Sequence, residues 1–221
     1  MQVKICGVRS RSDVAAAAEA GASYIGLVFF ARSPRSISLV DARWTVANAP
    51  EGLRRVALVV DPDDAFLETL IEQVPLDMLQ LHGTESPARV AEIRTRFGKP
   101  VMKAVGIASE EDLPALADYA GVADQILVDA RPPAGAPMPG GHGIAFDWRL
   151  LHGRNWLGPW MLAGGLRPDN VAEAVRLTGA DQVDVSSGVE DTPGYKAHAK
   201  IAAFVRAAKA AQQDDSGEPT Q

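Results

Sequence analysis

Three features are scarce in this sequence, and each scarcity excludes a class of protein. One cysteine, Cys6, stands among 221 residues, so no internal disulfide can form and nothing favours an oxidising compartment. No apolar run approaches the roughly 20 residues of a membrane span, and the amino terminus lacks the basic and then apolar pattern of a signal peptide. Lysine and arginine number 22 against 28 acidic residues, and the net charge of −6 offers polyanions no general attraction. We therefore expect a cytoplasmic protein that binds neither nucleic acid nor a membrane.

Candidate metal ligands are also few. The four histidines are scattered without the paired spacing of a metal site, and a single cysteine adds no second sulfur. We therefore expect no metal centre. With 47% hydrophobic and 23% charged residues, the chain has the composition and length to bury a full core as one domain.

Short apolar segments alternate with alanine-rich amphipathic segments, and the alternation repeats eight times. The predicted strands span residues 3–6, 24–29, 55–60, 78–81, 101–105, 125–128, 160–163 and 183–185. The predicted helices begin near Ser12, Leu39, Asp63, Ser86, Ser109, Asp147, Pro168 and Lys196. Because a left-handed residue commonly follows a helix, four helices are expected to end at Gly21, Gly98, Gly121 and Gly179.

Eight strand–helix units in one chain predict a TIM barrel, an α/β fold with a closed parallel sheet. The units average about 28 residues, which is lean for a fold of typically about 250, so some helices must be short. The competing fold, an open doubly wound sheet, is disfavoured because no Gly-x-Gly-x-x-Gly follows the first strand. We expect a single catalytic domain over residues 1–211 and a flexible tail over residues 212–221.

The chemistry of a TIM barrel lies where its strands end, so the residues that follow each strand are candidate site residues. They are Cys6, Asp61, His82, Asp129, Gly164, Gly165, Ser186, Ser187 and Gly188. A thiol at such an end is placed to meet a substrate. Asp61 is expected to cap the next helix instead, and His82 is interpreted first as a substrate contact.

Lys4 and Asp184 are expected to lie near Cys6. Side chains alternate along a strand, so positions 4 and 6 share a face, and Lys4 would lie below the thiol inside the barrel. A neighbouring ammonium lowers the pKa of a thiol from about 8.5, which predicts a thiolate. In a closed barrel the last strand neighbours the first, so Asp184 can pair with Lys4 or, alternatively, hold a substrate hydroxyl.

Glycine-rich and small-residue stretches follow the sixth, seventh and eighth strands. Backbone N–H groups in such stretches, together with the start of a short helix, can hold a phosphate. The residues expected to do so are Gly141, Gly164, Gly165, Ser186, Ser187 and Gly188. Arg35 is the candidate for a second anion, because its planar guanidinium can bind a carboxylate through two hydrogen bonds. Tight turns and a solvated arginine are the alternative explanations.

Short motifs in chain order carry a family resemblance. They are KICG at 4–7, SPRSIS at 33–38, QLHG at 80–83, LVDAR at 127–131, GGHG at 140–143, FDW at 146–148, AGGL at 163–166 and DVSSGVE at 184–190. Together they cover nearly the whole chain, and the sequence resembles the phosphoribosylanthranilate isomerase family of tryptophan biosynthesis. His142 departs from the pattern, since this loop more usually carries a small hydroxyl residue.

The resemblance implies a single-domain TIM barrel that catalyses an Amadori rearrangement, an aldose–ketose isomerisation, without a cofactor. The substrate is then a small phosphorylated molecule with a phosphate at one end and an anthranilate carboxylate at the other. By similarity, Asp129 is the general acid that opens the ribose ring, and Cys6 is the general base. The residues expected to contact the substrate are Lys4, Arg35, His82 and Asp184. We expect a monomer rather than a homodimer.

Two other functions are compatible with this fold. A related sugar-phosphate isomerase or epimerase would share the phosphate site, but an epimerase would need metal-binding histidines that this sequence does not offer. A non-catalytic barrel that binds phosphosugars would keep the glycine stretches, but it would have no reason to retain both Cys6 and Asp129. The joint presence of the thiol and the carboxyl therefore favours an enzyme.

Overall fold

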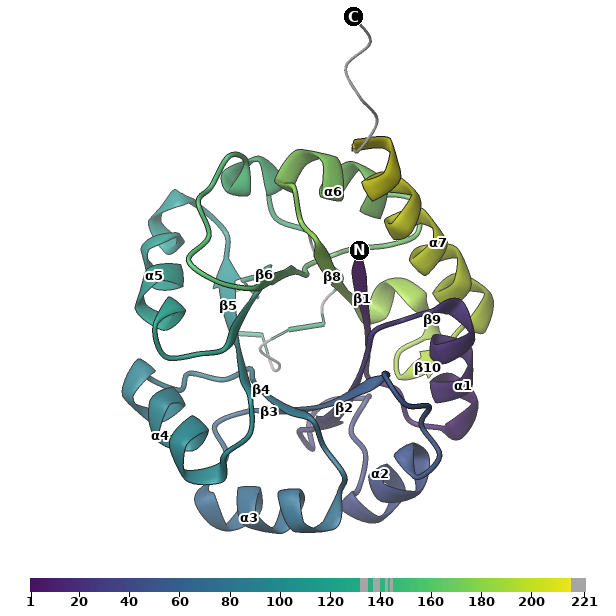
Figure 1. The fold of residues 1–221 in the computed structure, drawn as a ribbon, viewed down its shortest axis with the longest axis vertical. Helices are drawn as coiled ribbons and strands as arrows, with labels where there is room; N and C mark the ends of the chain where they lie inside the picture. Colours follow the sequence, from purple (N-terminus) through teal and green to yellow (C-terminus); the bar gives the residue numbers. More distant parts are fainter. Residues whose placement is uncertain (132–134, 137–139, 142, 144, 216–221) are drawn as a thin grey trace, which may run out of the picture.

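The computed structural model describes residues 1–131, 135, 136, 140, 141, 143 and 145–215. Eight parallel strands close into a barrel in chain order, and helices surround it on the outside (Figure 1). The strands are β1 (Gln2–Cys6), β2 (Tyr24–Phe29), β3 (Arg54–Val59), β4 (Met78–Leu81), β5 (Val101–Ile107), β6 (Gln125–Ala130), β7 (Trp160–Leu162) and β8 (Gln182–Val185). The predicted TIM barrel is confirmed, because β1 pairs with both β2 and β8 and leaves no open edge.

The helices are α1 (Arg11–Ala20), α2 (Leu39–Val46), α3 (Asp64–Gln73), α4 (Pro87–Phe97), α5 (Pro114–Ala120), α6 (Val171–Thr178) and α7 (His198–Asp215). Single 3₁₀ turns form η1 (Glu110–Asp112), η2 (Trp148–Leu151) and η3 (Ser187–Val189). A small hairpin of β9 (Glu190–Thr192) and β10 (Tyr195–Lys196) lies between β8 and α7. None of the helices that the structure describes has the length and apolar composition needed to cross a membrane.

Most of the helix ends follow the sequence signals. Side-chain caps that accept a backbone N–H three residues ahead are Ser10, Ser38, Asp63 and Ser86. Left-handed glycines end three helices at Gly21, Gly98 and Gly179. The helix α5 also ends at Gly121 as predicted, but this glycine is not left-handed, since its φ is −94°. Val122 and Ala123 both donate to the carbonyl of Tyr119 there, so the chain turns without a left-handed residue.

Two predicted helix starts differ from the structure. The helix expected near Asp147 is only the turn η2, because Gly153 takes a left-handed φ of +64° soon after it. The helix expected near Pro168 begins at Val171, since Asn170 Oδ1 accepts the N–H of Arg167 at 2.7 Å and holds residues 167–170 in a turn. Both differences shorten a helix, as a lean barrel requires.

The expected boundary between the domain and its tail falls inside α7. This helix continues to Asp215, four residues past the predicted end of the domain at residue 211. Gln212 fixes the extension, because its Nε2 donates to Asp181 Oδ1 at 2.8 Å and its Oε1 accepts from the amino terminus. The rest of the predicted tail, residues 216–221, lies outside the described residues.

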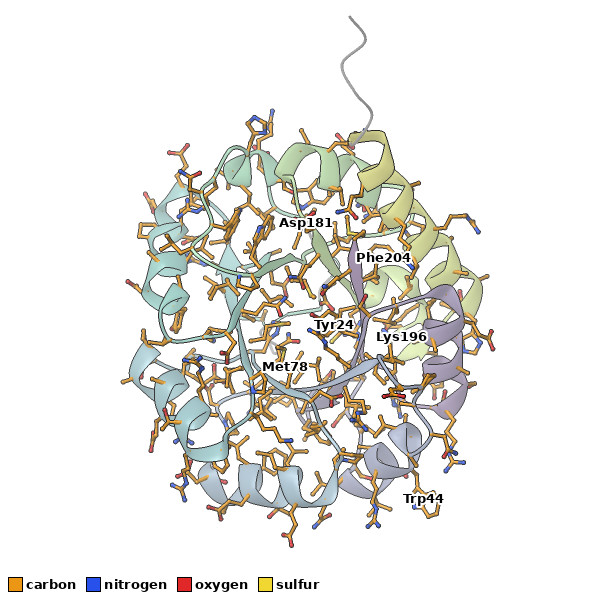
Figure 2. All side chains as sticks on the ribbon, viewed as in Figure 1. Tyr24, Trp44, Met78, Asp181, Lys196 and Phe204 are labelled. Carbon is orange, nitrogen blue, oxygen red and sulfur yellow. The ribbon has the colours of Figure 1, made fainter. Side chains whose placement is uncertain are left out.

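Apolar side chains fill the barrel lumen. This group includes Tyr24, Val56, Met78, Met102, Leu127 and Met161. Figure 2 shows Tyr24 and Met78 inside the ring of strands and Phe204 of α7 against its outside. The lumen is therefore a filled core, and the space for a ligand lies at the carboxyl ends of the strands.

Candidate active site

A pocket opens at the carboxyl ends of the strands. All the predicted site residues except Lys4 and Gly188 line it, namely Cys6, Arg35, His82, Asp129, Gly141, Gly164, Gly165, Ser186, Ser187 and Asp184. They come from six different strands and the loops that follow them, so the closed barrel brings together residues that are far apart in the sequence.

Cys6 ends β1 and points into this pocket from a buried position. Gly26 of β2 stands opposite in the strand register, and a Cβ at that position would lie 2.8 Å from the Cys6 sulfur. Burial raises the pKa of the Cys6 thiol, and Lys4 and Lys196 offset this effect only in part. Burial therefore favours the protonated thiol in the resting site and works against the thiolate expected from the neighbouring Lys4.

Lys4 lies two residues earlier on the same face of β1. Its Nζ donates to Asp184 Oδ1 at 2.9 Å, and the two residues are partners in the pairing of β1 with β8. Burial alone would lower the pKa of Lys4, but Asp184 and Cys6 outweigh it and raise this pKa. Lys4 is fully buried and does not line the pocket, so the expected substrate contact is replaced by an ion pair. Asp184 makes this pair and still borders the pocket.

Asp129 and His82 form a second polar group on the pocket wall. Asp129 Oδ2 lies 3.3 Å from His82 Nε2, and Gln80 Nε2 lies 2.9 Å from the other ring nitrogen. With Gln80 donating to Nδ1, the ring proton is on Nε2 and faces Asp129. Gly140 passes close over the pair, because a Cβ there would lie 2.6 Å from His82 Nε2 and 2.8 Å from Asp129 Oδ2.

Arg35, in the loop after β2, is buried and held by a carboxylate. Its Nε and Nη2 donate to the two oxygens of Glu190, each at 2.8 Å. Two glycines make room for the side chain, since a Cβ on Gly7 or Gly141 would lie 2.7 Å from Arg35 Cδ or Nη1. The guanidinium is thus fixed with Nη1 toward the loop that contains Gly141.

The small-residue stretches converge on one side of the pocket. Gly164 and Gly165 both have left-handed φ angles, +85° and +64°. A Cβ on Gly143 would lie 3.4 Å from Ser187 Oγ, which brings the loop after β6 against η3. Gly188 does not line the pocket, but a Cβ there would lie 1.9 Å from the Leu166 carbonyl, so only glycine lets the two loops meet. His142 lies outside the described residues.

Sequence reasoning missed three polar residues of this region. Gln80 precedes His82 by two positions, so the alternation of a strand could have placed both on one face. Glu190 and Lys196 lie in a polar hairpin that no periodic pattern marks. Their only signal is that a segment with two acids and a lysine directly follows a small-residue stretch.

Asp61 does not cap the next helix, as the sequence suggested. Asp63 is the cap of α3, and its side chain accepts the N–H of Phe66. Asp61 instead has a left-handed φ of 45°, and its Oδ1 accepts the N–H of Thr84 at 2.7 Å. It therefore ties the loop after β3 to the loop after β4. Across the described residues, no three histidine, cysteine or acidic side chains come together as a metal site would require.

Comparison with known proteins gives one consistent result. The family model described as N-(5'phosphoribosyl)anthranilate (PRA) isomerase matches residues 3–207. The N-(5'-phosphoribosyl)anthranilate isomerase of Cereibacter sphaeroides is 61% identical over 95% of this chain and 99% of its own length. The crystal structure of the phosphoribosyl anthranilate isomerase of Thermotoga maritima superposes with a TM-score of 0.86 at 34% identity, covering 95% of this chain and 99% of that one.

A further solved structure is that of a phosphoribosyl anthranilate isomerase in complex with reduced 1-(o-carboxyphenylamino)-1-deoxyribulose 5-phosphate. It superposes with a TM-score of 0.83 at 34% identity, again over 95% of this chain and 99% of that one. These matches extend over all eight strands of the barrel. The chain therefore belongs to the N-(5'-phosphoribosyl)anthranilate isomerase family and is an isomerase of tryptophan biosynthesis.

Proposed function

We propose that Cys6 and Asp129 carry out the two proton transfers by which the chain isomerises N-(5'-phosphoribosyl)anthranilate. The observation that supports this assignment is that the thiol and the carboxyl border the same pocket from strands three places apart in the ring. Protonated Asp129 gives its proton to the ring oxygen as the ribose opens to a Schiff base. The Cys6 thiolate then removes the proton from the adjacent carbon, and the enolamine relaxes to the ketone.

The state of Cys6 sets the pH dependence of this mechanism. Because burial keeps the resting thiol protonated, the active fraction of the enzyme grows as pH rises toward the pKa of Cys6.

The remaining pocket residues suit the two anions of the substrate. The backbone N–H groups of the loops after β7 and β8 are suited to the phosphate. Arg35 is suited to the anthranilate carboxylate, since its guanidinium borders the pocket and is fixed by Glu190. The ligand of the relative described above carries both a carboxyphenyl group and a 5-phosphate, which agrees with this arrangement. Cytoplasmic location and the monomeric state stay predictions from the sequence.

Turnover of phosphoribosylanthranilate by the purified protein, followed by loss of substrate fluorescence, tests the assignment. We expect Cys6→Ala and Asp129→Asn to fold and each to lower kcat by about 10²- to 10⁴-fold, the range for loss of one proton-transfer group. Asp169→Asn, at a side chain that is 72% exposed, is the matched control and should retain full activity. Full activity in Cys6→Ala or Asp129→Asn would remove that residue from the mechanism, and a folded but inactive wild type would favour a binding protein.

A further inference from the structure

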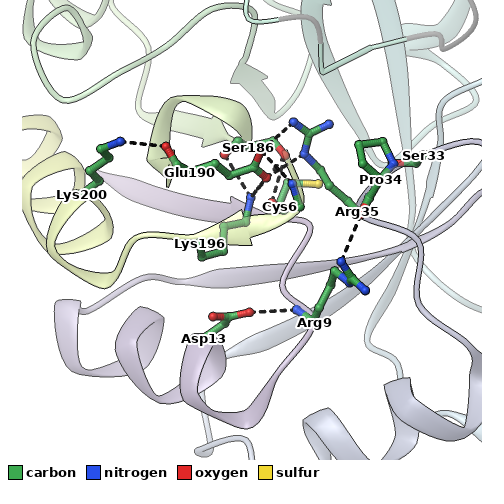
Figure 3. A network of polar contacts seen from close by, with 11 residues as sticks. Cys6, Arg9, Asp13, Ser33, Pro34, Arg35, Ser186, Glu190, Lys196 and Lys200 are labelled. Atoms are coloured by element: carbon green, nitrogen blue, oxygen red, sulfur yellow. Dashed lines mark hydrogen bonds and ion pairs between the residues drawn. The ribbon is translucent and has the colours of Figure 1, made fainter. Parts of the chain in front are cut away.

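A second cluster of buried charges lies beside Cys6, on the side of the hairpin β9–β10. It consists of Arg35, Glu190 and Lys196, and Figure 3 shows the three side chains around Ser186 and Cys6. Lys196 comes from β10, and its side chain is completely shielded from solvent although it carries an ammonium. Burying an ammonium group costs free energy even when it is paired with a carboxylate. The fold alone does not explain why the lysine of a two-residue strand points inward.

One carboxylate in this cluster serves two cations. Glu190 Oε1 accepts from both Arg35 Nε and Lys196 Nζ, each at 2.8 Å, and Glu190 Oε2 accepts from Arg35 Nη2 at the same distance. With two positive groups and one negative group, the cluster keeps an excess of one positive charge. Lys4 and Asp184 on the other side of Cys6 balance each other. The uncompensated charge near the thiol therefore belongs to the cluster with Lys196.

Lys196 also connects to the backbone of Cys6 through one residue. Its Nζ donates to the Ser186 carbonyl at 3.0 Å and lies 3.4 Å from Ser186 Oγ. The Ser186 hydroxyl in turn donates to the carbonyl of Cys6 at 3.1 Å. These contacts hold the ammonium next to the end of β1, where the thiol enters the pocket.

We propose that Lys196 is a positioning residue of the isomerase, whose buried ammonium stabilises the Cys6 thiolate, and that Glu190 limits this effect by sharing its carboxylate between Lys196 and Arg35. The inference rests on the proposed role of Cys6 as the base. The charged groups that act on the thiol are Lys4, Asp184 and Lys196, and those that act on Lys196 are Glu190, Cys6 and Arg35. Burial has the largest effect on Lys196 and lowers its pKa, while Glu190 and Cys6 oppose this fall. Burial raises the pKa of Cys6, and the ammonium of Lys196 works against that rise.

The single cysteine makes the thiolate directly measurable. Alkylation by iodoacetamide, followed by mass spectrometry as a function of pH, reports the pKa of Cys6 without any turnover. Lys196→Met should lower the alkylation rate at pH 7 by about tenfold, because it removes a neighbouring positive charge. Glu190→Gln should raise that rate by a similar factor, because it removes the negative charge that offsets Lys196. A purely structural role would instead change both variants in the same direction.

Turnover adds a second readout. Lys196→Met should lose about tenfold in kcat at pH 7 and recover at higher pH, where the thiol ionises without help. Lys196→Arg keeps the charge and should stay close to the wild type in alkylation. Lys200→Met is the matched control, since Lys200 lies in the same region, is 46% exposed and contacts Asp191 and the Glu190 carbonyl. It should leave the pKa of Cys6 unchanged.

The outcomes separate this inference from the proposed function. An alkylation profile of folded Lys196→Met that matches the wild type would overturn the inference, as would shifts of equal sign in Lys196→Met and Glu190→Gln. If Lys196→Met does not fold, Glu190→Gln and Lys196→Arg still decide, and a slower rate in Glu190→Gln would count against the inference. Turnover by Cys6→Ala would refute the role of Cys6 as base, while the alkylation result would still show whether Lys196 acts on the thiol.

Discussion

The ion pair of Lys4 with Asp184 joins the first and last strands of the barrel inside its lumen. The register of β1 with β8 places the two residues side by side, and the pair lies directly below Cys6 on the face that β1 turns inward. Both side chains are buried, so the pair links β1 to β8 next to the proposed base, Cys6.

The stability of this pair should depend on pH with a definite sign. Because the pKa of Lys4 in the folded protein lies above its unfolded value of about 10.4, the stabilisation is fully present below that pH and is lost as pH rises through the folded pKa. We expect the difference in unfolding free energy between the wild type and Lys4→Met to be constant from pH 7 to about 9.5 and to shrink above about 10.4. Urea denaturation at a series of pH values measures it. A difference that grows in alkali would contradict the ion pair.

Arg35 should not be replaceable by lysine. Arg35→Lys keeps the charge but loses the planar fork that grips both oxygens of Glu190, so the remaining cation is no longer directed at the pocket. We expect kcat/KM to fall by about tenfold to a hundredfold, which corresponds to about 1–3 kcal/mol. Arg32→Lys, at an exposed position of the same loop, is the control and should be neutral. Unchanged kcat/KM in Arg35→Lys would place the anthranilate carboxylate elsewhere.

Individual residues also mark where sequence reasoning stops. Cys6 could be identified because it ends a strand, but its ionisation could not, since the pKa of a buried thiol depends on burial and on charges from its own strand and two other segments. Lys196 and Glu190 could not be assigned to the site from the sequence. Their hairpin has no periodic pattern, and only the packed barrel brings them beside Cys6 and Arg35.

Among the structural elements, the loop after β7 offers a test of the phosphate site. Gly165 lines the pocket with a φ of +64°, whereas Gly179 ends α6 with a nearly equal φ of +66° and would place a Cβ in open space. Alanine at either position should cost a similar free energy, about 1–2 kcal/mol, because both require left-handed backbone. Only Gly165→Ala should also weaken competitive inhibition by inorganic phosphate, by about tenfold. Equal inhibition constants in the two variants would mean that Gly165 serves the turn alone.

Strands and helices could be predicted from the sequence where their buried faces give a regular pattern of apolar residues. Every predicted strand is present with limits that differ by no more than two residues, because short apolar runs between turn signals have one place in a parallel sheet. The helices were less certain at their ends. The segment after Asp147 contains suitable residues for a helix but gives only a 3₁₀ turn, and Pro114 separates η1 from α5 within what the sequence marks as one helix from Ser109.

At the scale of the whole molecule, a chain of net charge −6 binds an anionic substrate through local charge alone. Away from the pocket, salt bridges at the outer surface neutralise acidic residues. Asp64, for example, pairs with Arg89 and Arg96. Around Cys6, the pocket instead carries one balanced pair, Lys4 with Asp184, and the cluster with one excess positive charge. Attraction is therefore expected only at short range, at the glycine-rich loops and Arg35 that we propose to hold the two anions.

The oligomeric state depends on the apolar side chains that the surface exposes. Large apolar side chains exposed in the described chain are few, and the most exposed, Leu157, precedes β7 at the end of the barrel opposite the pocket. Trp44 and Tyr195 are each covered by a guanidinium of the same chain, Arg11 at 5.5 Å and Arg9 at 5.7 Å from the ring centres. Isolated residues of this kind do not make the continuous apolar surface of about 800 Å² per subunit that a stable dimer buries.

We therefore expect a monomer of 23.4 kDa in sedimentation velocity and light scattering, although one solved relative, from Thermotoga maritima, is described as dimeric. The unfolding midpoint should then be independent of protein concentration, because no subunit interface contributes to stability. Trp44→Ser and Leu157→Ser should each leave the mass unchanged and the stability unchanged to within about 0.5 kcal/mol. A mass of twice the chain, reduced to that of one chain by either substitution, would place a dimer interface at that residue.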